Sequence, residues 1–353
     1  MEKRNVLIVG AGPAGLTAAK ILAENGKDVL VLEKLPEESI GDKVCGGAIF
    51  SHPFLNRDEI PVTKILRNIK IRVFDKTIDF EPENLEVLII ERKTLGQYQL
   101  KKAKQAGADV KSATSVSSFD RSENCVCLSD GTKIGYDYLI GADGSNSVVR
   151  KGLGYNTKKR ALCISYDVPE KHNDFVMNYN FASWYFWYSW IIPHEDYTNV
   201  GVGFLPELCN TKEMENRFNA WADKNGFELK DGERRAAPIY FDYHGFKHGN
   251  VFLTGDAASF ASSAVGEGIP QAIRSGEIAA KAVLDPGYNF KRDVNDLLRY
   301  HRHFSFLLTL ALDFPMFTKK AFESSEKFKN LIEELSLTLK IGITQEALIA
   351  FYR

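Results

Sequence analysis

The amino-acid sequence predicts an α/β fold that combines a parallel-sheet domain, a domain of antiparallel sheet and a helical C-terminal segment. Three observations predict this architecture. A strand, a glycine-rich turn, a helix and a second strand open the chain, and short strands with polar turns fill its middle. A further strand, glycine turn and long helical pattern follow near residue 250. We therefore expect two distant parts of the chain to build one α/β domain.

The first strand and helix are the clearest elements. Val6–Val9 is an unbroken apolar run, as expected for a strand that is buried on both faces. A helical pattern follows the glycines and stops at Gly26, and a second strand ends at Glu33. This order is the βαβ arrangement of a parallel sheet.

The glycine spacing and the acidic residue predict a Rossmann-like dinucleotide site. Gly10 permits a tight turn, Gly12 lets a pyrophosphate approach the backbone, and Gly15 lets the helix pack on the strand. The helix N-terminus would face the phosphates. Glu33 can accept hydrogen bonds from a ribose. The motif by itself does not separate FAD from NAD.

Two later segments also have patterns typical of nucleotide contact. Asp137–Arg150 is a short strand followed by a turn-rich acidic segment. Gly249–Val283 is a strand, then Gly255 and Asp256, then a glycine turn that opens a long helix. An Asp just after a strand can reach a polyol hydroxyl, and the helix start is a second anion-binding end. We therefore predict an elongated cofactor that both ends of the chain bind.

Taken in order, G-A-G-P-A-G, Glu33, G-A-D-G-S-N-S-V-V-R and G-D-A-A resemble the three FAD signatures of the p-hydroxybenzoate-hydroxylase-like flavoproteins. The resemblance covers about Asn5–Val283 and implies that family's topology for the Rossmann-like domain. It implies FAD as the cofactor. Ser263 stands where the family commonly has proline. The residues implied to bind FAD are Gly10, Gly12, Pro13, Ala14, Gly15, Glu33, Lys34, Arg92, Val116, Asp143, Gly255, Asp256, Gly268 and Ile269.

The segment "GDKVCGGAIF" indicates a branch of this family. A cysteine followed by two glycines favours close backbone approach by something flat, although a glycine turn with an incidental cysteine gives the same pattern. The segment resembles the K-x-C-G-G segment of geranylgeranyl reductases. That resemblance implies that Cys45, Gly46 and Ala48 lie near FAD, with Ala48 where many relatives have glycine.

The aromatic segment "YSWIIPHEDYTNVGVG" is the second indication. It is similar to the reductase pattern Y-x-W-x-F-P followed, after seven residues, by G-V-G. In a strand, Tyr188, Trp190 and Ile192 would point to one side and form an apolar wall suited to a prenyl chain. A sheet that packs on its own core would look the same. The candidate catalytic residues are Cys45, Tyr188 and Trp190.

We predict an FAD-dependent oxidoreductase that reduces C=C double bonds of a prenyl or similar apolar substrate. The electron donor would be external, either NAD(P)H or a ferredoxin-like protein, because no second Rossmann motif is present. One alternative is a monooxygenase or halogenase acting on an aromatic substrate, since "YSWIIP" is also similar to the halogenase pattern W-x-W-x-I-P. Such an enzyme would use a lysine, for which Lys64, Lys70 and Lys76 are candidates. A non-catalytic electron-carrying flavoprotein is the other alternative.

The expected domain boundaries follow from these patterns. Residues 1–58, 86–152 and 247–290 would form the discontinuous FAD-binding domain, and residues 59–85 and 153–246 the substrate domain of antiparallel sheet. Residues 291–353 are apolar helical patterns with Lys and Arg interspersed. They would cap the substrate domain or lie on a membrane surface as a lid.

The composition limits the remaining possibilities. A chain of 353 residues suggests about two domains, and a net charge of −1 does not favour a nucleic-acid partner. The five cysteines have irregular spacing, which indicates a reducing compartment. Cys125 and Cys127 have no further ligands near them, so we expect no metal site. Without an apolar stretch of signal or membrane-span length, we predict a cytoplasmic protein, with peripheral membrane contact as an option.

Overall fold

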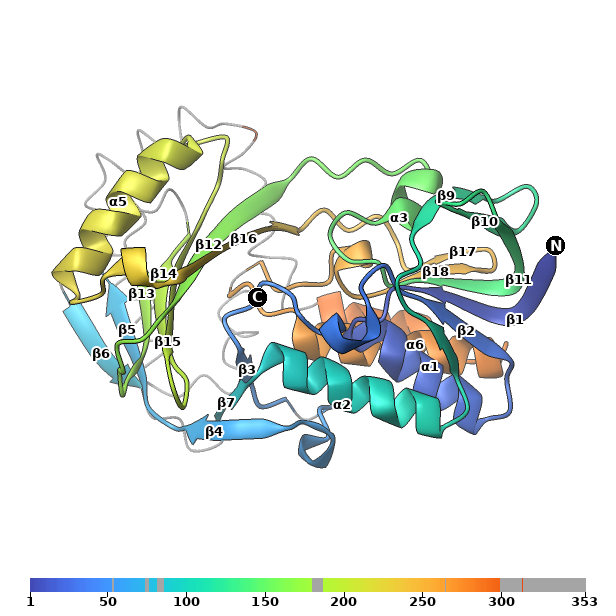
Figure 1. Ribbon diagram of the computed structural model, residues 1–353, viewed down its shortest axis with the longest axis horizontal. Coiled ribbons are helices and arrows are strands. Elements are labelled where there is room, and N and C mark those ends of the chain that lie inside the picture. The colour runs from blue at the N-terminus through green and yellow to red at the C-terminus, as the bar shows by residue number, and fades with distance from the viewer. Residues whose placement is uncertain are drawn as a thin grey trace.

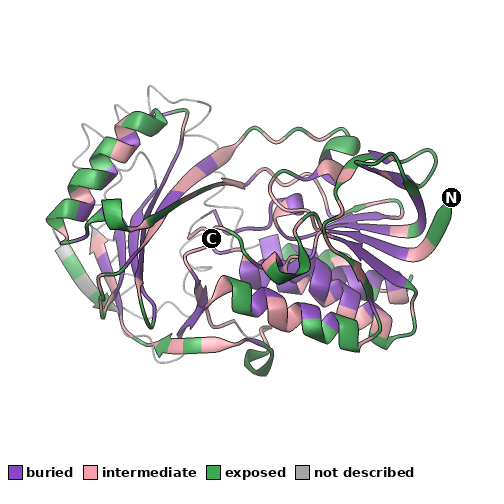
Figure 2. Cartoon of the chain, viewed as in Figure 1, coloured by how far each residue is buried: buried purple, intermediate pink, exposed green. Residues whose placement is uncertain are grey.

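The computed structural model describes residues 1–52, 54–73, 76–80, 86–179, 187–263, 265–298 and 313. Its described part has two large sheets at opposite ends of the molecule and a small sheet between them (Figure 1). Both large sheets are buried along their centres (Figure 2). The molecule is a mixed α/β fold, as the sequence predicts.

The first large sheet contains the parallel βαβ unit. Its strands follow the order β17-β18-β11-β1-β2-β8, and β10 joins β11 to β9. β1 runs parallel to both β2 and β11, and β18 runs parallel to β11. The strands are β1 (Glu2–Val9), β2 (Val29–Leu32), β8 (Asp109–Lys111), β9 (Val116–Asp120), β10 (Cys125–Leu128), β11 (Lys133–Gly141), β17 (Lys247–His248) and β18 (Val251–Leu253). Strands from early, middle and late parts of the chain thus meet in one sheet.

Helices cover this sheet and bring two helix starts together. α1 (Pro13–Glu24) packs against α6 (Ile269–Leu284) and α2 (Arg92–Gln105), while α3 (Val148–Gly152) lies next to β9. At Gly276 of α6, an added Cβ would lie 2.3 Å from the carbonyl oxygen of Ala14. The two helices approach this closely only because position 276 has no side chain. Short 3-10 turns occur at Glu37–Ser39, Arg57–Glu59, Leu229–Asp231 and Gly255–Ala258.

The second large sheet is mostly antiparallel, with the order β16-β12-β15-β14-β13-β5-β6. Its one parallel pair among the described strands is β13 with β5. α5 (Thr211–Lys224) covers the outer face of this sheet (Figure 1). The strands are β5 (Ile69–Val73), β6 (Lys76–Phe80), β12 (Arg160–Val168), β13 (Phe175–Tyr179), β14 (Ser189–Pro193), β15 (Thr198–Phe204) and β16 (Glu233–Tyr240).

The third sheet has the order β3-β7-β4 and lies between the others. Its strands are β3 (Ala48–Phe50), β4 (Val62–Leu66) and β7 (Val87–Ile90). β7 is fully buried and leads directly into α2. The small sheet therefore fixes both the segment after Cys45 and the start of α2.

The helical pattern at the C-terminal end falls almost wholly outside the described residues. Residues 290–298 are helical, and beyond them the structure describes Asp313. Among the residues it describes, no helix has the length and apolar character needed to cross a bilayer. All five cysteines are free thiols.

Candidate active site

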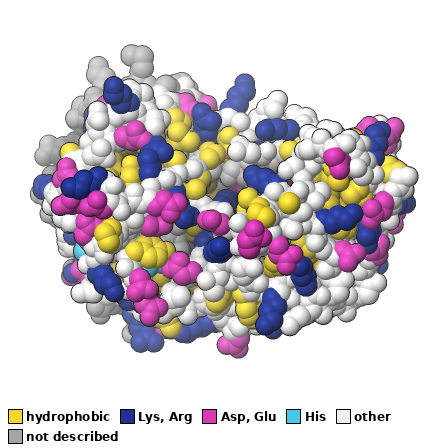
Figure 3. Space-filling view, viewed as in Figure 1, with side chains coloured by type: hydrophobic (Ala, Val, Ile, Leu, Met, Phe, Trp, Pro, Cys, Tyr) yellow, Lys and Arg dark blue, Asp and Glu magenta, His cyan; other side chains and the backbone are white. Residues whose placement is uncertain are grey.

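A cavity of about 650 Å³ lies between the two large sheets. This volume is typical of cofactor and substrate sites. One half of its lining comes from the β1–α1 turn, the end of β2, and the starts of α2 and α6, while the other half comes from β12, β13, β14 and β16. On the face drawn in Figure 3, hydrophobic and charged side chains lie interspersed, and both kinds occur near the middle of the molecule. The cavity thus joins a polar region to an apolar one.

The glycine turn after β1 has the geometry that its spacing predicts. Gly10 has a φ of +103°, and an added Cβ there would lie 2.4 Å from the carbonyl oxygen of Ala142. At Gly15, a Cβ would lie 2.0 Å from the carbonyl oxygen of Gly10, so this glycine packs the helix on the turn and does not line the cavity. Gly12 lines the cavity, and a Cβ there would meet nothing within 4 Å. The open space beside Gly12 is where a pyrophosphate would fit.

The start of α1 is suited to an anion. Gly12 is its N-cap and supplies no side-chain cap, and Pro13 begins the helix. The first N–H groups of a helix have no partner within it, and its dipole favours negative charge there. Pro13 and Ala14 both line the cavity. A phosphate group would therefore satisfy this helix end.

Glu33 ties the end of β2 to the glycine turn. Its two carboxylate oxygens accept hydrogen bonds from the backbone N–H of Ala11 (2.7 Å) and of Leu35 (2.9 Å). A carboxylate has about four acceptor positions, so capacity for ribose hydroxyls remains. Lys34 and Val116 also line the cavity near this end.

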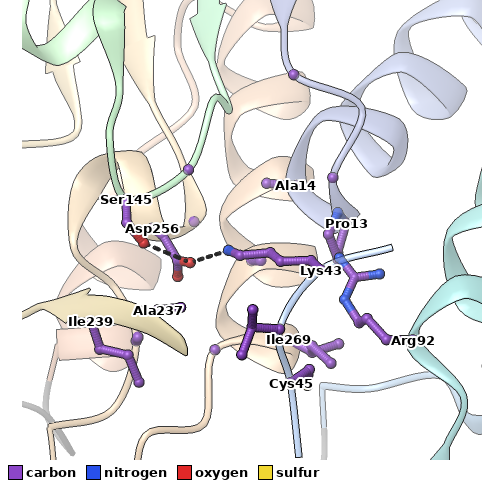
Figure 4. A pocket seen from close by; sticks show the side chains of 18 of the residues that line it. Pro13, Ala14, Lys43, Cys45, Arg92, Ser145, Ala237, Ile239, Asp256 and Ile269 are labelled. Atoms are coloured by element: carbon purple, nitrogen blue, oxygen red, sulfur yellow. Dashed lines mark hydrogen bonds and ion pairs between the residues drawn. The ribbon is translucent and has the colours of Figure 1, made fainter. Parts of the chain in front are cut away.

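Arg92 provides the test of whether an anionic group fits. Its side chain extends from the start of α2 toward Pro13 (Figure 4). The buried Nη1 atom has no hydrogen-bond partner within the described part of the chain. Burial lowers the pKa of the Arg92 guanidinium, and the nearby Cys45 and Asp256 oppose this change. A buried, unsatisfied guanidinium nitrogen is costly, and the oxygen-rich middle of a dinucleotide would satisfy it.

Asp256 follows β18 and is held by residues from two other segments. Its Oδ2 lies 2.6 Å from Lys43 Nζ and accepts a longer hydrogen bond from the Ser145 hydroxyl (3.4 Å) (Figure 4). Burial raises the pKa of Asp256, but the charge and hydrogen bond of Lys43, together with the charge of Arg92 and the hydrogen bond of Ser145, outweigh burial and lower it overall. The remaining oxygen, Oδ1, lies 3.3 Å from where a Cβ of Gly268 would stand. An ionised acceptor at this position suits a polyol hydroxyl.

Asp143 has a mainly local role. Its Oδ2 accepts hydrogen bonds from the backbone N–H of Val148 (2.6 Å) and Val149 (3.2 Å), so it holds the start of α3. Burial raises the pKa of Asp143, and its Oδ1 is buried without a partner among the described residues. Asp143 lines the cavity together with Gly255, Gly268 and Ile269.

The Cys-Gly-Gly turn lies between the polar and apolar halves of the cavity. Cys45, Gly46 and Ala48 all line it. A Cβ at Gly46 would lie 2.7 Å from Ile192 Cδ1, so the turn packs directly on β14. Gly47 has a φ of +74°, and its N–H donates to the Cys45 sulfur at 3.3 Å. Both glycines are therefore needed for this close backbone approach.

The aromatic wall is built on the glycines of β15. Tyr188, Trp190 and Ile192 line the cavity together. A Cβ at Gly201 would lie 2.2 Å from the Trp190 ring, and one at Gly203 would lie 2.3 Å from the Trp187 ring. The G-V-G pattern thus leaves room for two indole rings to lie against the strand. Trp184, another tryptophan of this stretch, falls outside the described residues.

Polar atoms in this wall are paired. The Trp190 indole N–H donates to Asn199 Oδ1 at 2.8 Å, and the Tyr188 hydroxyl donates to the carbonyl oxygen of Val265. Burial, followed by the nearby Tyr179, raises the pKa of Tyr188 well above its usual range. Tyr188 is thus neutral, and its hydroxyl hydrogen is used in the hydrogen bond to the Val265 carbonyl.

Sequence reasoning missed several residues of the cavity. Lys43 stands within the K-x-C-G-G segment, but its partner Asp256 is 213 positions away. Alternate residues of a strand share a face, so the two cavity-lining residues on β12 and the two on β13 could have been predicted if the pairing of these strands had been known. The missed residues include Lys43, Ser145, Cys163, Ser165, Phe175, Met177 and Glu267.

Comparison with known proteins adds to this geometry. Residues 4–171 match the pyridine nucleotide-disulphide oxidoreductase family. A digeranylgeranylglycerophospholipid reductase of Methanocella arvoryzae is 30% identical over 306 residues, which cover 79% of this chain and 77% of the relative.

Solved structures share the fold. A geranylgeranyl bacteriochlorophyll reductase-like protein from Thermoplasma acidophilum superposes with a TM-score of 0.78 at 20% identity, covering 99% of this chain and 96% of that one. The myxobacterial chondrochloren halogenase superposes with a TM-score of 0.69 at 17% identity, covering 95% and 89%. The same scaffold therefore occurs in proteins named for different chemistries.

Proposed function

Because the chain belongs to the geranylgeranyl reductase family of FAD-dependent oxidoreductases, we propose that this enzyme saturates carbon–carbon double bonds of a prenyl chain. FAD is its cofactor. Arg92, Glu33, Asp256 and the start of α1 would hold the cofactor's polar parts. Reduced FAD supplies the hydride for such a reaction.

The observation that supports the prenyl substrate is the apolar half of the cavity. It continues from the cofactor half without a break, and its walls are the faces of β13 and β14 with part of β16. An apolar chain gains from leaving water in proportion to its buried area. The lining side chains of this half include Phe50, Phe175, Met177, Trp187, Tyr188, Trp190, Ile192 and Ile239.

The wall residues would place the chain and keep water away. Trp190 is fixed by its packing on Gly201 and by its bond to Asn199. We assign Tyr188 to the wall as well, because its hydroxyl is bonded to a carbonyl and its raised pKa opposes proton loss. Cys45 remains the candidate proton donor, since it stands at the junction of the two halves. The electrons would come from an external donor, NAD(P)H or a ferredoxin-like protein.

An anaerobic experiment tests the proposal. The FAD-loaded enzyme is reduced, a geranylgeranyl lipid is added without oxygen, and flavin reoxidation and product mass are followed. We expect reoxidation with a gain of two hydrogens per saturated double bond. Cys45→Ala and Trp190→Ala should alter turnover while FAD stays bound. Wild-type rates in both variants would contradict the assignment of these residues.

Halogenation or hydroxylation of an aromatic substrate is the second candidate, favoured by the fold shared with a halogenase. Among the described residues, the lysines that line the cavity are Lys34 and Lys43, and Lys43 is paired with Asp256. Lys64 and Lys70 do not line it, and the side chain of Lys76 is outside the described set. Reoxidation that requires oxygen, with halide or an aromatic compound present, would support this candidate instead. A flavoprotein that only carries electrons would bind FAD and turn over neither substrate.

A further inference from the structure

His194 stands directly behind the Cys-Gly-Gly turn, and the reductase and flavoprotein patterns assign it no role. It follows Pro193 at the end of β14 and is 5% exposed. The ring stacks on Tyr197 with 4.2 Å between ring centroids and 11° between planes. An added Cβ at Gly47 would lie 2.5 Å from His194 Cε1. The imidazole is therefore packed tightly in one orientation.

Both ring nitrogens of His194 face oxygen atoms that accept hydrogen bonds. Nδ1 lies 2.8 Å from Glu91 Oε1, and Nε2 lies 3.0 Å from the carbonyl oxygen of Gly46. A carbonyl oxygen can only accept, and a carboxylate can only accept while it is ionised. Glu91 also accepts hydrogen bonds from the Tyr197 hydroxyl at 3.1 Å on each oxygen.

Glu91 is the charged acceptor of this pair. The hydrogen bond from His194 is the largest cause that lowers the pKa of Glu91; burial opposes it, and the hydrogen bond from Tyr197 and the charge of Arg235 add to it. Glu91 is therefore ionised at neutral pH. An acceptor thus stands opposite each nitrogen of the His194 ring, so the ring can donate at both ends.

The peptide group that His194 contacts also touches the Cys45 sulfur. The carbonyl of Gly46 and the N–H of Gly47 belong to one peptide unit, and that N–H donates to Cys45 Sγ at 3.3 Å. Hydrogen bonding at the oxygen of a peptide strengthens its N–H as a donor. The contacts therefore form a continuous path from Glu91 through His194 and this peptide to the sulfur.

We propose that His194 is a positioning residue for Cys45: with Glu91 as its counter-ion, it fixes the Gly46–Gly47 peptide and increases the anionic character of the Cys45 sulfur. The inference rests on the proposed function in treating Cys45 as part of the reaction site. The other charged groups near this path are Arg92 beside Cys45, and Arg235 and Asp167 beside the Glu91–Tyr197 pair. Within the described part of the chain, none of these three side chains forms a hydrogen bond with the Gly46–Gly47 peptide.

Alkylation of the full-length, FAD-loaded enzyme tests this inference without any substrate. Iodoacetamide is added at a series of pH values, and mass spectrometry of peptides measures the rate at Cys45, with Cys127 on β10 as the internal reference. His194→Gln should slow Cys45 alkylation at neutral pH by roughly three- to tenfold, the effect of one hydrogen bond. His172→Gln, which changes a histidine that does not line the cavity, should leave the rate unchanged.

Glu91→Gln separates charge from packing. A glutamine amide can donate to Nδ1, so the ring stays in place and still donates through Nε2 to Gly46, but it has lost its counter-ion. If the charge acts on the sulfur, Glu91→Gln also slows alkylation, and the double variant is no slower than His194→Gln alone. If Cys45 in Glu91→Gln is alkylated at the wild-type rate and with the wild-type pH profile, the proposal is overturned. If the His194→Gln protein is isolated without FAD, the result for Glu91→Gln alone is decisive.

The outcomes also separate this inference from the proposed function. Slower alkylation in both variants of an enzyme that reduces no prenyl lipid would leave the inference standing and the proposed function wrong. Prenyl reduction by the wild type with unchanged alkylation in both variants would leave the function standing and the inference wrong.

Discussion

Arg92 extends toward the start of α1 with a buried guanidinium nitrogen that no described residue satisfies. A cofactor phosphate or hydroxyl would pair with it. Arg92→Gln should therefore weaken FAD binding by about 10- to 100-fold, the range for a hydrogen bond to a charged group. Titration of the apoprotein with FAD, followed by flavin fluorescence, measures this. Arg217→Gln, at an exposed pair on α5, is the control, and equal affinities for both variants would contradict the assignment.

Lys43 and Asp256 predict a pH dependence of stability. Lys43 lowers the pKa of Asp256 in the folded state. The pair therefore stabilises the fold at pH values above the pKa that Asp256 has in the unfolded chain. This stabilisation is lost as the pH falls through the lowered pKa of the folded state. In Lys43→Met, the main opposition to burial is lost, so the pKa of Asp256 rises, with Arg92 and Ser145 still acting to lower it. The variant should therefore be least stable, relative to wild type, near pH 7, with the difference shrinking toward about pH 4.

Urea unfolding at several pH values measures this difference. Lys104→Met, which removes an exposed pair with Glu37, is the control and should show a small difference that hardly changes with pH. If the free energy of unfolding of Lys43→Met were lower than that of wild type by the same amount from pH 7 to pH 4, the pair would not act through ionisation of Asp256.

At the scale of elements, the contact between α1 and α6 sets the distance between the two helix starts that line the cavity. Gly276→Ala would improve helix propensity by about 1 kcal/mol. The new methyl group would meet the backbone of Ala14, which cannot move aside cheaply, and such overpacking costs about 1–3 kcal/mol. We expect a net loss of stability and weaker FAD binding, measured by thermal unfolding and titration. Lys281→Ala, exposed on the same helix, should change neither, and a Gly276→Ala variant as stable as wild type would contradict the prediction.

The elements also show why part of the site could be predicted. Gly10, Gly15 and Glu33 act within one βαβ unit, so their spacing along the chain specifies their geometry. Lys43 and His194 find their partners across strand pairings and between sheets, which no local pattern specifies. The shared face of Tyr188 and Trp190 was predicted from the two-residue period of a strand. Their polar partners come from neighbouring segments and were not.

At the scale of the whole molecule, the cavity is lined by both large sheets. A cofactor bound there contacts the native fold and has no such site in the unfolded chain. FAD at about 1,000 times its dissociation constant should therefore add about 4 kcal/mol to the free energy of unfolding. Calorimetry of the apo and FAD-loaded protein measures the difference. If the apoprotein and the protein saturated with FAD unfolded at the same temperature, the cofactor would not bind the folded state in preference to the unfolded chain.

The strand order of the first sheet has a consequence for synthesis of the protein. β11 lies between β1 and β18, and β18 is made more than a hundred residues after β11. While the chain is still growing on the ribosome, β10 can pair with the first part of β11, but Leu139–Gly141 at its end have an unpaired edge until β18 emerges, and such an edge can pair with other chains. The helix start at Ile269 appears later still. The cofactor site of a nascent chain is therefore completed only after its middle portion has passed through a period in which part of a sheet edge is exposed.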